Sequence, residues 1–150
     1  MIVLQTLGAA AIRIGTHTML PSGMRAFCGL LFLAEERGRE IRRSELQGLL
    51  FPERSDRAAS HSLRQVLYRL RRMGAPIEAT GDAIILPGDA VEADYLGLRD
   101  FNSVNSETAR SVMRGVLPGF RPSFSERLGA WVEERRSAIQ HEVLQSLIAK

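Results

Sequence analysis

The sequence predicts an α+β protein in which short strands flank three helices. Three observations lead to this class. Short β-branched runs separated by glycine occupy residues 2–20, which is typical of short paired strands. Between residues 22 and 74, apolar side chains recur at helical spacing in three segments. Two further apolar runs, 77–79 and 83–86, flank Thr80-Gly81-Asp82, and this pattern predicts a β-hairpin.

The composition excludes several classes of protein. The chain is 45% hydrophobic and 25% charged, as in an ordinary globular protein. A single cysteine, Cys28, rules out an internal disulfide framework, and we expect it to be buried because it lies in the longest apolar run, residues 26–34. That run is too short to cross a bilayer, and the N-terminus lacks a secretory signal. We therefore expect a cytoplasmic protein with no membrane partner.

Charge divides the chain into two parts. Residues 1–76 carry 12 Arg and 6 acidic residues, net +6, whereas residues 77–150 carry 8 basic and 11 acidic residues, net −3. Such an asymmetry suggests two modules with different partners. We place the boundary at residue 90, so that residues 1–90 and 91–150 form the two predicted domains.

The first predicted elements are two strands and a buried helix. Residues 2–7 predict a strand, and residues 11–14 predict a second one that can continue to Leu20. Together they would form a small N-terminal antiparallel sheet. Ser22 is expected to cap a helix that is apolar on most sides and ends before Gly38. A helix with this pattern belongs in a protein core.

A helix pair and the hairpin come next. A very short strand is expected within residues 39–42, and Ser44-Glu45-Leu46-Gln47 matches a capping box for a short helix that stops at Pro52. The third helix, residues 57–73, would be capped by Ser55 or Asp56 and end at Gly74. Two helices joined by a loop, with a hairpin wing after the second, form a winged helix-turn-helix.

The helix over residues 57–73 has one apolar face and one cationic face. Its apolar residues at helical spacing are Leu63, Val66, Leu67, Leu70 and Met73. At ~100° per residue the opposite face collects Arg57, His61, Arg64, Gln65, Tyr68, Arg69 and Arg72. No acidic residue occurs between Asp56 and Glu78. Such a face suits the major groove of DNA, although a merely solvated arginine-rich face is the alternative.

The segment after the hairpin predicts an all-α region. Residues 91–101 predict one helix, residues 102–105 a turn, and Ser106 to Arg114 a second helix. After a Pro/Gly-rich connector, residues 125–150 predict one long helix. Its Trp131 would pack either on the first domain or on a missing partner, which is the next repeat or a second copy of the chain.

Several motifs resemble those of a known family. In chain order they are Ile2 to Gly8, Arg25-Ala26-Phe27, Ile41 to Leu46, and Ser62 to Gly74. Their order resembles the winged-helix DNA-binding domain of the OmpR/PhoB type, in the form found at the front of SARP-family bacterial transcriptional activators. In the second part, Asp94-Tyr95-Leu96 and Trp131 to Arg136 look like the start of a bacterial transcriptional activation domain, which is built from TPR-like helical repeats.

The chain departs from the family pattern at three places. Leu50-Phe51 stands where the family usually has Leu-Trp, and the expected wing carries Glu78 and Asp82 but no Arg or Lys. A wing beside phosphate normally needs a cation. The family's activation domain is also longer than the segment present here. We therefore expect either a fragment of a longer protein or a short member of the family.

We found no constellation of residues that suits catalysis. The three histidines, His17, His61 and His141, are far apart and have no Cys, Asp or Glu at metal-ligand spacing. Nucleotide-binding glycine loops and nucleophile elbows are missing from the sequence. The sequence therefore predicts neither an enzyme nor a cofactor or metal site.

The leading hypothesis is a sequence-specific DNA-binding transcriptional regulator. The residues expected nearest the bases are Ser60, His61, Arg64 and Gln65. Those expected at phosphates are Arg42, Arg43, Arg57, Tyr68, Arg69 and Arg72. The resemblance implies double-stranded DNA as partner, with RNA polymerase and a second copy of the chain, joined through the C-terminal helix or on tandem DNA sites, as further candidates. The alternative is a protein–protein interaction module that keeps the winged-helix shape without binding DNA.

Overall fold

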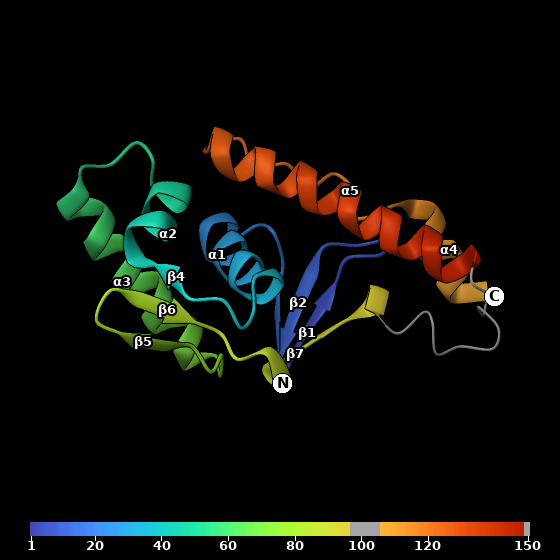
Figure 1. Cartoon of the computed structure of the whole chain (residues 1–150), viewed down its shortest axis with the longest axis horizontal. Coiled ribbons are helices and arrows are strands. Elements are labelled where there is room, and N and C mark those ends of the chain that lie inside the picture. Colours follow the sequence, from blue (N-terminus) through green and yellow to red (C-terminus); the bar gives the residue numbers. More distant parts are fainter. Residues whose placement is uncertain (97–105, 149–150) are drawn as a thin grey trace.

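The computed structural model describes residues 1–96 and 106–148, with the side chains of residues 1–96 and 110–146. It confirms the predicted α+β class, because the described residues form two small sheets and a set of α-helices (Figure 1). No helix among these residues is long and apolar enough to cross a membrane.

The first sheet combines the N-terminal strands with a strand from much later in the chain. Its order is β3 (His17–Met19), β2 (Ala11–Ile14), β1 (Ile2–Gln5), β7 (Val91–Ala93). The pair β1–β2 is antiparallel, as predicted. The pair β2–β3 is also antiparallel, and β7 runs parallel to β1. The expected continuous second strand is divided into β2 and β3 at Gly15, whose φ of +57° places the backbone in a turn conformation.

The predicted helix over residues 91–101 is wrong at its start, because Val91–Ala93 is strand β7. Val91 and Ala93 are buried while Glu92 is exposed, which is the alternation of a strand and not of a helix. A short 3-10 turn follows at residues 94–96. The rest of the expected helix, and the turn expected at 102–105, lie outside the described residues.

Asp94, directly after β7, is hydrogen-bonded to the residues that follow β1. Its carboxylate accepts hydrogen bonds from the Thr6 backbone N–H at 3.0 Å, the Thr6 hydroxyl at 2.8 Å and the Leu7 backbone N–H at 2.8 Å. Hydrogen bonds to an ionised acceptor are shorter and stronger than neutral ones. One carboxylate therefore satisfies the donors left where β1 stops.

Helix α1 (Met24–Glu35) is the central element of the core, as predicted. Every residue from Ala26 to Ala34 is buried, including Cys28. The expected cap is wrong: the N-cap residue is Gly23 rather than Ser22, and no side chain caps the helix. Pro21 and Ser22 instead belong to the turn closed by the Gly23 N–H and the Leu20 carbonyl.

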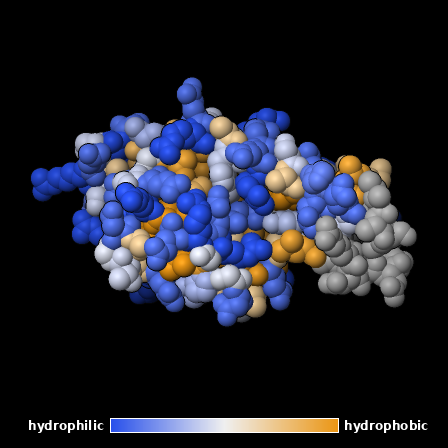
Figure 2. Space-filling view, in the orientation of Figure 1, coloured by the Kyte–Doolittle hydropathy of each residue, from blue (hydrophilic) through white to orange (hydrophobic). Residues whose placement is uncertain are grey.

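Helices α2 (Arg43–Leu50) and α3 (Asp56–Arg72) pack against each other and against α1. The expected capping box is wrong, since α2 begins directly after Arg42 with no side-chain cap, and the Arg43 N–H donates to the Asp82 carbonyl. The cap of α3 is confirmed, because the Ser55 hydroxyl accepts from the Ala58 N–H at 3.3 Å. Hydrophilic side chains predominate over this end of the molecule (Figure 2).

The predicted hairpin after α3 is confirmed. Strands β5 (Glu78–Thr80) and β6 (Ala83–Ile85) pair in antiparallel fashion around the turn at Gly81. Strand β6 also pairs with β4 (Ile41–Arg42), which gives a three-stranded sheet of order β4-β6-β5. Because β4 leads directly into α2, this sheet ties the hairpin to the start of the helix pair.

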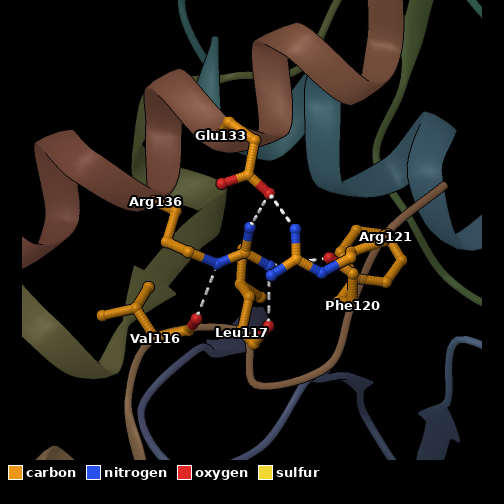
Figure 3. A network of polar contacts seen from close by, with 6 residues as sticks. All are labelled: Val116, Leu117, Phe120, Arg121, Glu133 and Arg136. Carbon is orange, nitrogen blue, oxygen red and sulfur yellow. Dashed lines mark hydrogen bonds and ion pairs between the residues drawn. The ribbon is translucent and has the colours of Figure 1, made fainter. Parts of the chain in front are cut away.

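Two helices follow, α4 (Ser106–Arg114) and α5 (Glu126–Ile148), with bounds close to those predicted. The connector between them is held by Arg136 of α5 (Figure 3). Its guanidinium donates to the carbonyls of Val116 at 3.0 Å, Leu117 at 2.9 Å and Phe120 at 2.6 Å, and it contacts Glu133. A single side chain thus satisfies three carbonyls of a loop that has no regular structure of its own.

Helix α5 packs across α1 (Figure 1). The ring of Trp131 lies 4.9 Å from that of Phe32, and its indole N–H donates to Glu36 at 3.2 Å. Of the two predicted roles for Trp131, packing within the chain is therefore confirmed. Side chains from both predicted domains, 1–90 and 91–150, belong to one hydrophobic cluster. The division at residue 90 itself stays a prediction.

A buried polar contact accompanies this packing. The Tyr95 hydroxyl donates to the Glu35 carboxylate at 2.8 Å, and Arg135 of α5 lies 3.5 Å from the same carboxylate. Burial, and then the negative charge of Glu35, raise the pKa of Tyr95 to about 12. The phenol is therefore neutral and able to donate throughout the ordinary pH range.

Replacing Asp94 should weaken the first sheet. Asp94→Ala leaves two backbone donors and a hydroxyl without their acceptor, and we expect the free energy of unfolding to fall by about 2 kcal/mol. Urea unfolding followed by circular dichroism measures the change. Asp89→Ala is the matched control, because Asp89 is exposed and its loss should change stability by less than about 0.5 kcal/mol. Equal stability of the two variants would contradict the role assigned to Asp94.

Cys28 should resist alkylation in the folded protein. Burial raises the pKa of its thiol from 9.0 to about 12, so the reactive thiolate is scarce below that pH. Iodoacetamide at about pH 8 should modify the folded chain far more slowly than the denatured chain, because only the latter exposes a thiol of ordinary pKa. Mass spectrometry counts the adduct, and fast modification of the folded chain would contradict the buried position.

Candidate nucleic-acid interface

The outward face of α3 carries most of the predicted contact residues. Exposed on it are Arg57, His61, Arg64, Gln65, Tyr68, Arg69 and Arg72. The Tyr68 side chain is 63% exposed, and Ser60, at one edge of the face, is half-buried. The buried side of the helix consists of Ala59, Ser62, Leu63, Leu67 and Leu70. The sequence pattern thus separated the two faces of this helix correctly.

Most of these basic side chains have no polar partner among the described residues. Within the part of the chain that the structure describes, the side chains of Arg57, Arg64 and Arg69 make no hydrogen bond or ion pair. Arg72 differs, because its guanidinium donates to the Tyr68 hydroxyl at 3.3 Å and lies over the Tyr68 ring. Arg71 differs too, since its Nε donates to the Ile77 carbonyl at 3.2 Å. The free arginines are therefore available to an external anion.

Arg42 and Arg43 lie where β4 meets α2 rather than on α3. Arg42 is exposed and Arg43 half-buried. A depression of about 400 Å³ brings the starts of α2 and α3 together with the hairpin turn. Asp56 and Asp82 line this depression together with one arginine, Arg54, so the two carboxylates weaken phosphate binding at that point.

Two arginines outside the predicted set lie beside the edge of α3 that carries Gln65 and Arg69. Arg25 from the first turn of α1 and Arg54 from the loop between α2 and α3 line a cavity of about 300 Å³ together with Arg69. Arg25 precedes Arg54 by 29 positions and Arg69 by 44 positions, so no local sequence pattern connects Arg25 with the other two. The basic surface is therefore wider than one helix face.

Glu53 is the acidic neighbour of these two arginines. Its carboxylate lies 2.5 Å from Arg25 and 3.7 Å from Arg54. A hydrogen bond from its own backbone N–H, followed by one from Arg25, lowers the pKa of the Glu53 carboxyl. The carboxylate is accordingly ionised and offsets one of the two positive charges.

The described residues do not assemble a metal site. No group of three or more His, Cys, Asp or Glu that could hold a metal ion occurs among them. The histidines His17, His61 and His141 lie on β3, α3 and α5 respectively. The described geometry provides a cationic surface with exposed hydrogen-bond donors.

Comparisons with known proteins do not identify the chain. No protein-family model matches it, and neither the curated proteins nor the solved structures that were compared contain a match. Assignment of a function therefore depends on the chain's own residues.

Proposed function

We propose that the chain is a sequence-specific DNA-binding transcriptional regulator of the winged helix-turn-helix type. The observation that carries this proposal is the outward face of α3. It has several arginines that make no hydrogen bond or ion pair with described residues, and no carboxylate occurs between Arg57 and Arg72. Guanidinium groups bind phosphate and guanine in bidentate fashion. An exposed helix of this kind fits the major groove, which is about 12 Å wide.

The order of the elements supports the proposal. Helix α3 follows α2 after a short loop, and the β5–β6 hairpin follows α3 and pairs with β4. In a helix-turn-helix the second helix enters the groove while the first crosses the backbone. The hairpin corresponds to the wing, but its turn carries Asp82 and no cation, so we assign it no phosphate contact.

Contacts can be assigned by position on α3. His61, Arg64 and Gln65 lie toward the bases in this arrangement, and Arg57, Arg69 and Arg72 lie toward phosphates. Ser60 and Arg43 are half-buried and would contribute less than the exposed residues. One such helix reads only a few base pairs, so high specificity calls for a second copy of the chain on a repeated site.

Binding to a mixed-sequence duplex should depend steeply on salt. If the five arginines predicted at phosphates, which are Arg42, Arg43, Arg57, Arg69 and Arg72, each neutralise about one phosphate, log K should fall against log salt with a slope of about −4 to −5. Arg57→Ala should make the slope shallower by about one unit, because one counterion fewer is released. Fluorescence anisotropy at several salt concentrations measures both. Arg13→Ala on β2 is the matched control, since Arg13 is exposed on another element and should leave the slope unchanged.

A folded wild-type chain that fails to bind at low salt would overturn the proposal. A slope that responds equally to Arg57→Ala and Arg13→Ala would remove α3 from the interface. Circular dichroism of each variant establishes that the fold is retained.

Arg64 should matter for sequence preference rather than for binding in general. After a site has been selected from random duplexes, Arg64→Ala should reduce the preference at one base position by about 1–3 kcal/mol. Its affinity for unrelated duplexes should change little, since those contacts go to phosphates. Anisotropy titrations with single-base variants of the selected site measure this. An unchanged preference at every position would contradict the base contact.

The alternative is a protein–protein interaction module, and one observation favours it. A groove of about 270 Å³ lies between α4, α5 and Leu7 and is lined by Val112, Val116, Val143 and Leu144. Leu144 is 54% exposed. The outward face of α3, however, is rich in charged residues, whereas the cores of protein–protein interfaces are depleted of them. The salt titration separates the two functions, because the alternative predicts no duplex binding.

A further inference from the structure

The cavity beside α3 combines three guanidinium groups from three different elements. Arg25 comes from α1, Arg54 from the α2–α3 loop and Arg69 from α3. No acidic side chain is among the described residues that line it, and Glu53 lies outside the lining next to Arg25 and Arg54. Three positive charges therefore line this cavity, whereas the acidic side chains Asp56 and Asp82 line the adjacent depression that Arg54 also borders. An excess of positive charge of this kind favours an anion.

Two of the three arginines are held in place by the protein itself. Arg25 donates to the Leu50 carbonyl at 2.9 Å and pairs with Glu53, and Arg54 donates to the Ser62 hydroxyl. Both guanidinium groups also lie over the Phe51 ring, with centroid distances of 5.2 Å and 4.9 Å. A fixed guanidinium loses less conformational entropy when it binds an anion. The guanidinium groups of Arg25 and Arg54 are therefore preorganised for binding an anion.

These contacts leave donors unused. Arg25 uses only Nη1 in its hydrogen bonds, and Arg54 uses Nη1 for Ser62. Arg69 has no partner among the described residues. The side chains of Arg25 and Arg54 remain 29% and 43% exposed, so an anion can reach them. At roughly 30 Å³ per water molecule, a volume of about 300 Å³ has room for a hydrated phosphate group.

The cavity opens at one edge of the proposed DNA-binding face. Gln65 and Arg69 belong to the exposed face of α3 and also line the cavity. A duplex with α3 in its major groove would pass a sugar–phosphate strand along this edge. We propose that one phosphodiester of the DNA backbone binds in this cavity. Arg54 and Arg69 would donate hydrogen bonds to it, and Arg25 would supply a third positive charge. This inference rests on the proposed function and adds Arg25 and Arg54 to its contacts.

The proposal is tested with Arg54→Met, which keeps an apolar body near Phe51 and removes the charge. In salt titrations of the full chain, Arg54→Met should make the slope shallower by about one unit, uniformly across duplex sequences. Arg54→Lys should restore most of the slope, because the charge returns, but less of the affinity, because the planar fork is lost. Arg13→Met is the matched control and should behave as wild type.

A second measurement addresses the cavity without DNA. Dimethyl phosphate, a mimic of the phosphodiester, is titrated into the wild-type chain at constant ionic strength, and arginine Nε–H signals are followed by NMR. The signals of Arg25, Arg54 and Arg69 should shift together and saturate, whereas that of Arg13 should not. Inorganic phosphate in a parallel titration distinguishes a general anion site from one that accepts a diester.

The outcomes separate this inference from the proposed function. If the wild type binds DNA but Arg54→Met keeps the full slope, the phosphate position is wrong while the function stands. If the wild type binds no DNA, both fail, and saturation by inorganic phosphate alone would then mark a site for a free anion. Absence of saturable shifts with dimethyl phosphate, despite a lower slope for Arg54→Met, would place the phosphate elsewhere and also overturn the inference.

Discussion

The burial of α1 along Ala26 to Ala34 is the constraint on which the rest of the structure depends. A helix that is apolar on all sides must be covered on all sides, since each exposed face would lose the free energy of burial. Helix α3 covers one side, the β1 sheet another, and α5 a third through Trp131 on Phe32. The connector adds Phe120, whose ring meets that of Phe27 at 5.2 Å. The core is thus built from both ends of the sequence.

Local patterns predicted most of the helices and strands but not all of their junctions. The apolar spacing of α3 and the hairpin at Gly81 depend on neighbouring residues, so they could be predicted with few errors. Strand β7 could not, because its three residues become a strand only by pairing with β1. Residues 91–93 carry a pattern too short to distinguish a strand from a helix. The predicted cap of α2 is wrong for the same reason, because Arg43 at the start of that helix donates to the distant Asp82 carbonyl. The predicted cap of α1 is wrong because a local turn, closed by the Gly23 N–H and the Leu20 carbonyl, precedes the helix.

The candidate site, too, could be predicted from the sequence only in part. The exposed residues of α3 follow from helical periodicity alone, and their separation from the buried side needed no tertiary information. Arg25 and Arg54 could not be identified, because they approach α3 only through the packing of α1 and of the loop around Phe51. A clue was present in Arg25, which stands at the start of the buried helix where a charged residue must reach the surface. Nothing in the local sequence indicated which surface that was.

The pairing of β1 with β7 has a consequence for how the chain is made. Strand β1 leaves the ribosome well before its parallel neighbour, which follows only at residues 91–93. At roughly 5–20 residues per second, β1 spends several seconds with one edge unpaired, a state prone to association with other chains. The N-terminal strand is therefore one of the last parts of the sheet to be completed during synthesis. Closure of that edge after translation of Asp94 moves the exposed edge of the sheet from β1 to β7, which has only three residues, and a short edge strand is a poorer template for association with another chain.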